Sequence, residues 1–185
     1  MSAKNTNSHL RVRMLCEGAM MVALAQVLSY IKLMELPNGG SLTPAMFPII
    51  LFAVRWGLTP GLMAGFTFGL LQLIFDGAYA WGWQSMLLDY LVAFMALGTA
   101  EFFARPFKNR TVGVAVGTFA AGFLRFMCSF LSGVLVWGNL NDGLAAWTYS
   151  LTYNGSYMLP ETLLTMVAAV LLCRVAPQIF DRQAR

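Results

Sequence analysis

Three charged residues lie inside long apolar stretches of this sequence: Asp89, Arg125 and Glu161. A charge deep in a bilayer costs a few kcal/mol unless it is paired or hydrated, so such residues mark binding sites, ion pathways or buried pairs. At about 1.5 Å of rise per residue, Arg125 and Glu161 fall at a comparable depth, and Arg125 would have to reach roughly 10 Å to meet Asp89. The sequence therefore predicts an Arg125–Glu161 ion pair, either purely structural or part of a proton or ion relay.

Aromatic and amide residues concentrate in the connecting segments 76–84, 137–143 and 147–154, which hold four of the five Trp residues. One interpretation is an aromatic belt at a membrane interface, although a belt is expected at both faces. The other is a binding site, because Asp89 lies about one turn inside the nearest apolar stretch. Aromatic rings and one carboxylate suit an organic cation, through cation–π attraction and charge-assisted hydrogen bonds.

The composition indicates what must position these residues. Of the 185 residues, 58% are apolar and only 11% are charged, whereas a soluble domain carries about 25% charged residues. The low charge argues against a soluble enzyme, a disordered chain and a nucleic-acid-binding protein. We therefore expect a single domain over residues 1–185, embedded in the lipid bilayer, with a flexible N-terminal tail at 1–10.

Charged residues divide the chain into six apolar stretches, and these predict an all-α integral membrane bundle of six transmembrane helices. Ten of the twelve Lys and Arg residues then fall on one side, Lys32 falls on the other, and Arg125 is buried. Because Lys and Arg accumulate on the cytoplasmic side, both termini are expected there. The expected helices cover about 14–33, 43–55, 58–75, 85–104, 111–137 and 146–174.

Several catalytic and metal-binding signatures do not occur in the sequence. It contains no G-x-x-x-x-G-K-[ST] loop for ATP and no G-x-S-x-G nucleophile motif. The one His, His9, lies in the polar tail, so we expect neither catalysis nor a metal site. If the chain accumulates a solute, its energy must come from an ion gradient or from a partner. Ala19 and Ala23, four residues apart, would let a partner helix approach closely.

Four segments, taken together, resemble the thiamine-specific S-component of energy-coupling factor (ECF) transporters over roughly residues 11–176. These S-components are six-helix proteins of the bacterial cell membrane that bind a vitamin and have no ATPase activity of their own. The resemblance implies thiamine as ligand, no cofactor, and as partners an ECF transmembrane coupling subunit and two ATPase subunits. The segments are Glu17-Gly18-Ala19-Met20-Met21-Val22-Ala23-Leu24-Ala25, Leu87-Leu88-Asp89-Tyr90-Leu91-Val92-Ala93-Phe94, Arg125–Trp137 and Tyr149–Gly155.

The same resemblance assigns roles to individual residues. It implies that Ala19 and Ala23 contact the transmembrane partner. It gives Asp89 the thiamine cation or aminopyrimidine, and Trp137 the stacking contact. The implied substrate-binding residues are Asp89, Tyr90, Tyr79, Trp137, Tyr149, Asn154 and Ser129.

The sequence departs from the family at two places. Ser129 stands where the family commonly has a His, and the first outer loop, around 34–41, lacks the Trp found in some members. Three alternatives therefore stay open. They are an S-component for another cationic or heteroaromatic vitamin or precursor, a solitary secondary transporter using Arg125 and Glu161, and a non-transport assembly protein.

Overall fold

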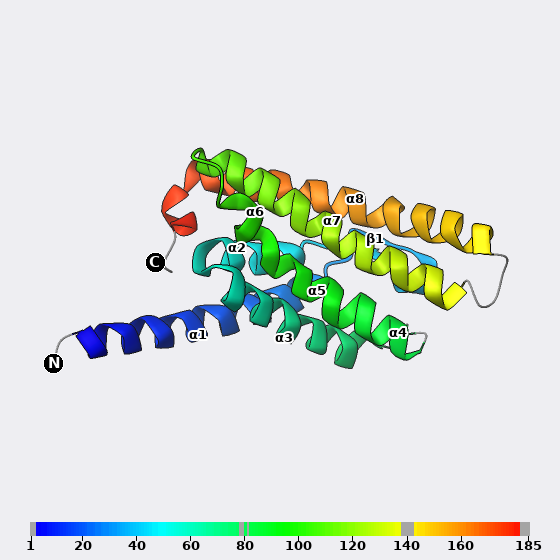
Figure 1. Ribbon diagram of the computed structural model, residues 1–185, viewed down its shortest axis with the longest axis horizontal. Helices are drawn as coiled ribbons and strands as arrows, with labels where there is room; N and C mark the ends of the chain where they lie inside the picture. The colour runs from blue at the N-terminus through cyan, green and yellow to red at the C-terminus, as the bar shows by residue number, and fades with distance from the viewer. Residues whose placement is uncertain (1–2, 78–79, 81, 138–142, 182–185) are drawn as a thin grey trace.

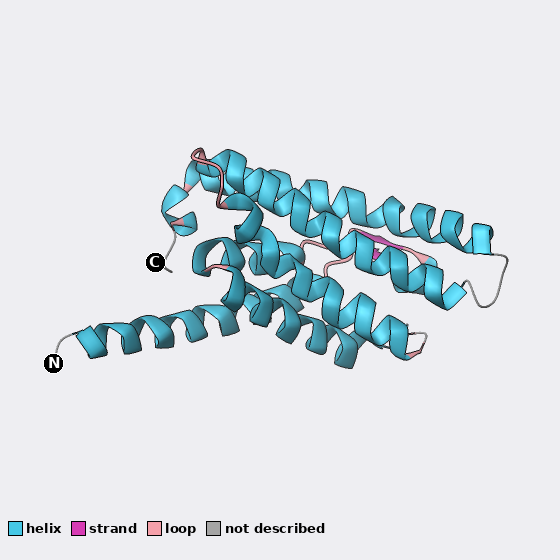
Figure 2. Ribbon diagram, in the orientation of Figure 1, coloured by secondary structure: helices cyan, strands magenta, loops and turns pink. Residues whose placement is uncertain are grey.

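The computed structural model describes residues 3–77, 80, 82–137 and 143–181, and the side chains of 3–7, 38, 137 and 143–144 lie outside this description. Long helices pack side by side, and α1 projects beyond the bundle at the end where both termini lie (Figure 1, Figure 2). The main helices are α1 (Ala3–Ser29), α2 (Met46–Trp56), α3 (Leu58–Asp76), the composite helix 4 (Trp83–Ala104), α7 (Arg110–Trp137) and α8 (Gly143–Val175).

Five of these helices are long and apolar enough to cross a membrane; α2 is shorter. The 11 residues of α2 rise only about 16 Å, roughly half of a hydrocarbon core of about 30 Å. Nine of them are buried. Because protein surrounds α2, its buried residues are apolar on all sides of the helix. These observations confirm the predicted all-α membrane bundle of six helices.

The helix ends differ from the sequence-based ranges at several places. α1 begins at Ala3 rather than at about residue 14, because the polar N-terminal residues continue the helix. It ends at Ser29, and a hairpin missed by the prediction follows. This hairpin pairs β1 (Met34–Glu35) with β2 (Ser41–Leu42) across the 3-10 turn η1 (Pro37–Gly39). α2 then begins at Met46 instead of about residue 43.

Helix 4 is continuous but changes its winding along its length. It consists of α4 (Trp83–Ser85), a π-helical segment η3 (Met86–Val92), α5 (Ala93–Ala96), a 3-10 turn η4 (Leu97–Thr99) and α6 (Ala100–Ala104). π-helical turns are rare and occur frequently at functional sites. Asp89 and Tyr90 both lie in η3, so the unusual winding coincides with two of the predicted binding residues.

Glycines at every fourth position let α3 pack directly on the backbone of helix 4. A Cβ added at Gly65 would lie 2.4 Å from the Phe94 carbonyl oxygen, and one at Gly69 would lie 2.3 Å from that of Tyr90. Close backbone approach through small residues is a common way to join helices in a membrane. This seam fixes the position of η3 relative to α3.

We predict that Gly65→Ala destabilises the protein, because a backbone carbonyl cannot move aside as a flexible side chain can. Overpacking of this kind costs about 1–3 kcal/mol, which corresponds to a fall in Tm of about 5 °C. Thermal unfolding in detergent measures the change. Gly155→Ala on α8 is the matched control, since its added Cβ would meet only the Leu159 side chain at 4.0 Å. Equal Tm values for both variants would contradict the prediction.

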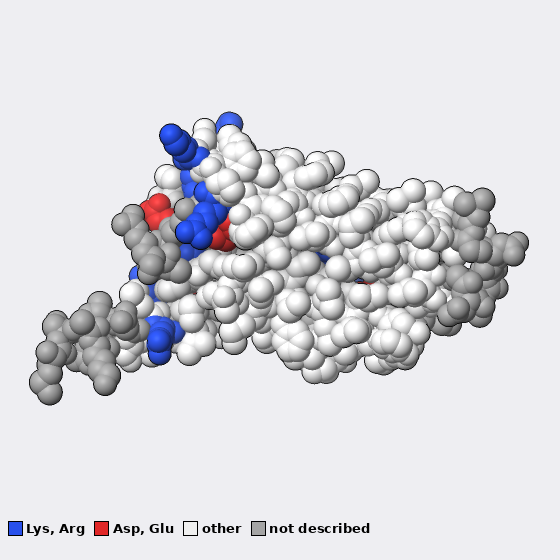
Figure 3. Space-filling view, viewed as in Figure 1, with Lys and Arg blue, Asp and Glu red and all other residues white. Residues whose placement is uncertain are grey.

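Basic residues gather at the end of the bundle that holds both termini (Figure 3). There Glu17 of α1 accepts hydrogen bonds from Arg13 at 2.8 Å, Arg55 at 2.9 Å and Trp56 at 2.7 Å. Arg110 pairs with Glu101 and also donates to the carbonyl oxygen of Phe180, in the terminal turn η5 (Pro177–Phe180). An ion pair thus connects α1 with α2, and hydrogen bonds from Arg110 connect α7 with the C-terminal turn.

Candidate ligand-binding site

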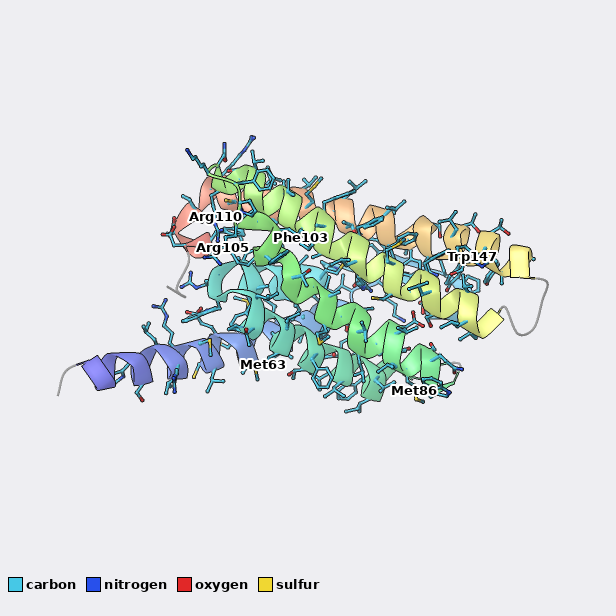
Figure 4. All side chains as sticks on the ribbon, viewed as in Figure 1. Met63, Met86, Phe103, Arg105, Arg110 and Trp147 are labelled. Carbon is cyan, nitrogen blue, oxygen red and sulfur yellow. The ribbon has the colours of Figure 1, made fainter. Side chains whose placement is uncertain are left out.

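A pocket of about 150 Å³ lies between helix 4, α7 and α8, with the β1–β2 hairpin over part of it. Met86 and Trp147, labelled in Figure 4, mark the end of the bundle near the pocket, and Arg105 and Arg110 mark the basic end opposite. Three carboxylates and one guanidinium line the pocket: Asp76, Asp89, Glu161 and Arg125.

Asp89 is held by two serine hydroxyls that both reach the same carboxylate oxygen. Ser85 donates to Oδ2 at 2.7 Å and Ser132 donates to it at 2.5 Å. Both serines are buried, so Oδ2 is satisfied within the protein. A third serine, Ser129, also interacts with this carboxyl group, and the hydrogen bonds from Ser85 and Ser132 both fall on Oδ2. The carboxylate is therefore oriented by one oxygen and keeps the other to accept a hydrogen bond from a ligand.

Arg125 and Glu161 form the deep wall of the pocket and bind each other. Arg125 Nη1 lies 2.5 Å from Glu161 Oε2, which confirms the predicted ion pair. Glu161 Oε1 also accepts from Thr43 at 3.1 Å. The guanidinium lies over the Phe94 ring, 4.7 Å from its centroid, an arrangement that favours a buried cation. The pair is therefore internally neutralised, and the lining holds two further carboxyl groups, Asp89 and Asp76, which give it a negative formal charge.

Three tyrosines at four-residue intervals form a ladder on one face of α8. Tyr149 and Tyr153 are stacked, with ring centroids 5.7 Å apart and planes at 12°. Tyr153 meets Tyr157 edge to face at 5.8 Å. All three line the pocket, because residues at i and i+4 share a helix face. The ladder gives the pocket an aromatic wall on its α8 side.

Five of the seven predicted substrate-binding residues line this one pocket: Asp89, Tyr90, Ser129, Tyr149 and Asn154. The other two predicted residues lie outside this description: Tyr79 is outside the described residues, and so is the side chain of Trp137, whose backbone ends α7. The structure thus collects residues from η3, α7 and α8 that are far apart in the sequence.

Two of these five residues have polar groups already engaged by the protein. The Asn154 amide donates to the Ser150 carbonyl oxygen at 3.0 Å and accepts from the Tyr157 hydroxyl at 3.2 Å. Tyr90 donates its hydroxyl to the Asp76 carbonyl oxygen at 3.0 Å. The polar groups of Asn154 and Tyr90 therefore hold the walls of the pocket in position. Asp89 differs, because its hydrogen bonds from Ser85 and Ser132 both fall on Oδ2 and Oδ1 can accept one from a ligand.

Several residues that line the pocket were not predicted from the sequence, and two of the Trp residues near this end of the bundle do not line it. Trp83 is 70% exposed and Trp147 is 52% exposed, so these two point outward as belt residues do. The lining residues that were not predicted include Ser85, Ser132, Tyr153 and Tyr157. The sequence does carry a signal for Tyr153 and Tyr157, because they follow Tyr149 at intervals of four residues and so share its helix face.

Ala19 and Ala23 lie far from this pocket on an exposed face of α1. Together with Gly18, Met63 and Thr67 they line an apolar groove between α1 and α3, with a volume of about 400 Å³. Exposed small residues beside a groove suit close approach by another helix. The structure therefore places the two alanines where a partner could reach them.

The site can bind a small organic cation. It offers a preoriented carboxylate oxygen, an aromatic wall and a net negative charge, and the described residues contain no cluster of three metal-ligating side chains. A multi-pass membrane bundle with such a pocket defines a solute-binding or transport protein.

Comparison with known proteins identifies the kind of transport protein. Residues 15–181 match the family model described as thiamine transporter protein (Thia_YuaJ). The thiamine transporter ThiT of Bacillus subtilis (strain 168) is 33% identical over 177 residues, covering 89% of this chain and 92% of the relative. That of Lacticaseibacillus paracasei is 32% identical over 192 residues, covering 93% and 92%.

A solved structure of ThiT from Listeria monocytogenes matches with a TM-score of 0.80 at 26% identity, covering 92% of this chain and 98% of that one. The chain belongs to the thiamine transporter family. It is accordingly a transport protein rather than an enzyme, and a multi-pass protein of a bacterial cell membrane.

Proposed function

We propose that this chain binds thiamine with high affinity from outside the cell, in the pocket between η3, α7 and α8. The observation that carries the proposal is the Asp89 carboxylate, with Oδ2 held by Ser85 and Ser132 and Oδ1 available. Thiamine joins a thiazolium cation to a neutral aminopyrimidine, so one carboxylate can balance the charge or accept from the amino group. Nanomolar binding needs about −12 kcal/mol, which requires burial of both rings as well.

The aromatic wall supports the same ligand. In the proposed complex, Tyr149, which is 41% exposed, supplies a ring face, and desolvated cation–π contacts contribute about 2 kcal/mol. Tyr90, Ser129 and Asn154 complete the walls. We also propose contacts from Tyr79 and Trp137, which lie outside the described residues and side chains, on the strength of the sequence resemblance.

We propose further that the chain is the S-component of an ECF transporter, with both termini in the cytoplasm and residues 1–185 acting as one membrane domain. Its partners are an ECF transmembrane coupling subunit and two ATPase subunits, which supply the energy for uptake. The basic end of the bundle supports this orientation, because Lys and Arg favour the cytoplasmic side. The exposed Ala19 and Ala23 support contact with the coupling subunit.

Mass spectrometry and calorimetry test the ligand. The expected result is that thiamine is released from purified protein on denaturation, and that ligand-free protein in detergent binds thiamine with submicromolar affinity. Another heteroaromatic cation in the released fraction, with no thiamine binding, would contradict the proposal. That result would favour an S-component for another vitamin, the alternative that Ser129 suggests.

We predict that Ala19→Trp leaves thiamine binding in detergent unchanged but abolishes uptake in vesicles containing all the partner subunits. An indole at position 19 fills the groove between α1 and α3 and prevents close helix approach. Radiolabelled thiamine uptake measures the effect. Leu24→Trp is the control, since Leu24 is exposed on α1 but does not line that groove. Loss of binding in Ala19→Trp would mean that Ala19 only packs the bundle.

A further inference from the structure

The β1–β2 hairpin is a preformed unit. Leu33 donates its amide to the Leu42 carbonyl oxygen at 2.9 Å, and Leu36 donates to that of Gly40 at 2.7 Å. A Lys32–Glu35 ion pair at 2.7 Å adds a contact at its base. Because its own hydrogen bonds define its shape, the hairpin can move as one body without losing that shape.

The tip of this hairpin forms part of the pocket. Gly39, Gly40 and Ser41 line it, and Gly40 is buried against α8. A Cβ added at Gly40 would lie 2.8 Å from the Tyr153 hydroxyl oxygen and 2.9 Å from the Tyr157 ring. The hairpin tip is therefore seated directly on the tyrosine ladder.

One hydroxyl joins both ends of the hairpin turn to α8. Tyr153 donates to the Pro37 carbonyl oxygen and accepts from the Gly40 amide at 2.9 Å. Pro37 is the first residue of the 3-10 turn η1, and Gly40 directly follows the turn. The Tyr153 ring is fixed independently by its contacts with Tyr149 and Tyr157. The hydroxyl can therefore be removed without moving the ring.

Beyond its tip, the chain is attached at a second point. Thr43, just after β2, donates to Glu161 at 3.1 Å, and Glu161 is bound in turn to Arg125. This buried contact anchors the chain between the hairpin and α2. A hairpin released at Tyr153 would remain tied at Thr43, so the tip would swing away from the pocket about that anchor.

We propose that the Tyr153 hydroxyl is a latch that holds the hairpin closed over the pocket and sets the rate of ligand release. The proposal rests on the proposed function, because it treats the pocket as the thiamine site. The Tyr153 hydroxyl is a positioning group: it acts on the hairpin, whereas the ligand is held by Asp89 and by the ring faces of the tyrosine ladder, which Tyr153→Phe keeps. Loss of two hydrogen bonds is expected to speed release about tenfold.

The test is Tyr153→Phe, which keeps the ring and removes the hydroxyl. Stopped-flow displacement of bound thiamine should show release about tenfold faster than in the unaltered protein, with a smaller change in Kd because entry is also faster. Tyr30→Phe is the matched control. It makes the same chemical change at an exposed residue just after α1, where the hydroxyl accepts only from Gln26 at 3.1 Å among the described residues. A release rate unchanged in Tyr153→Phe overturns the proposal.

A second measurement needs no ligand. Hydrogen–deuterium exchange of the peptide covering residues 34–42 should be faster in ligand-free Tyr153→Phe than in the unaltered protein or in Tyr30→Phe, because the Gly40 amide loses its acceptor. Equal exchange in all three proteins overturns the latch. Failure of the unaltered protein to bind thiamine contradicts the proposed function instead, and the exchange experiment still decides whether Tyr153 holds the hairpin.

Discussion

Asp89→Asn is expected to weaken thiamine binding at least tenfold. The substitution keeps the shape of the side chain but removes the negative charge that Oδ1 presents to the pocket. A hydrogen bond to a charged group is worth about 1.5–3 kcal/mol, and tenfold in Kd corresponds to about 1.4 kcal/mol. The amide nitrogen also introduces a donor, and if it faces Ser85 and Ser132, those hydroxyls must reorient to accept from it.

Tryptophan fluorescence titration or calorimetry in detergent measures this loss. Asp181→Asn is the control, because it removes the same charge just after η5, at the basic end of the bundle. A neutral analogue without the thiazolium charge sharpens the test, since Asp89→Asn should reduce its affinity less than that of thiamine if charge balance dominates. A thiamine Kd unchanged in Asp89→Asn would remove Asp89 from the binding site.

Glu161→Gln is expected to destabilise the fold strongly, because it leaves the Arg125 guanidinium buried without a counter-charge. Arg125 is 9% exposed and Glu161 is 1% exposed. Removing one partner of a buried pair typically costs about 3–5 kcal/mol. Thermal unfolding in detergent and the yield of monodisperse protein measure the change, and both should fall.

The double variant Arg125→Met, Glu161→Leu separates pairing from packing. It removes both charges together and should recover much of the stability, because an apolar pair of similar volume is often as stable as a buried ion pair. A Tm for Glu161→Gln equal to that of the unaltered protein would contradict the predicted effect. Vesicles without ATPase partners test the alternative of an ion relay. Uptake by the unaltered protein in such vesicles, together with its loss in either variant, would favour a relay through Arg125 and Glu161.

Much of the fold was predictable because hydropathy and charge act at the scale of a whole helix. The apolar stretches located α3, helix 4, α7 and α8 to within a few residues. The Arg125–Glu161 pair followed from depth alone, since both residues lie well inside long helices and neither charge is stable there unpaired.

Features that depend on contacts between distant segments were not predictable in the same way. Two-residue strands have no readable alternation, so the hairpin at 34–42 looked like a loop. The π winding of η3 has no local sequence signal. Ser85 and Ser132 are common residues whose importance appears only when both approach Asp89. Tyr153 gains its role from a hairpin that lies more than a hundred residues earlier.

The short helix α2 decides whether the two termini lie at the same end of the bundle or at opposite ends. The helices long enough to cross a bilayer number five among the described residues, and an odd number of crossings would send the two termini to opposite sides. The hairpin and α2 lead the chain back toward the end from which α1 starts, so that both termini lie at that end (Figure 1). A topology assigned from helix length alone would place every segment after residue 45 on the wrong side, because it would leave out the eleven residues of α2, nine of which are buried.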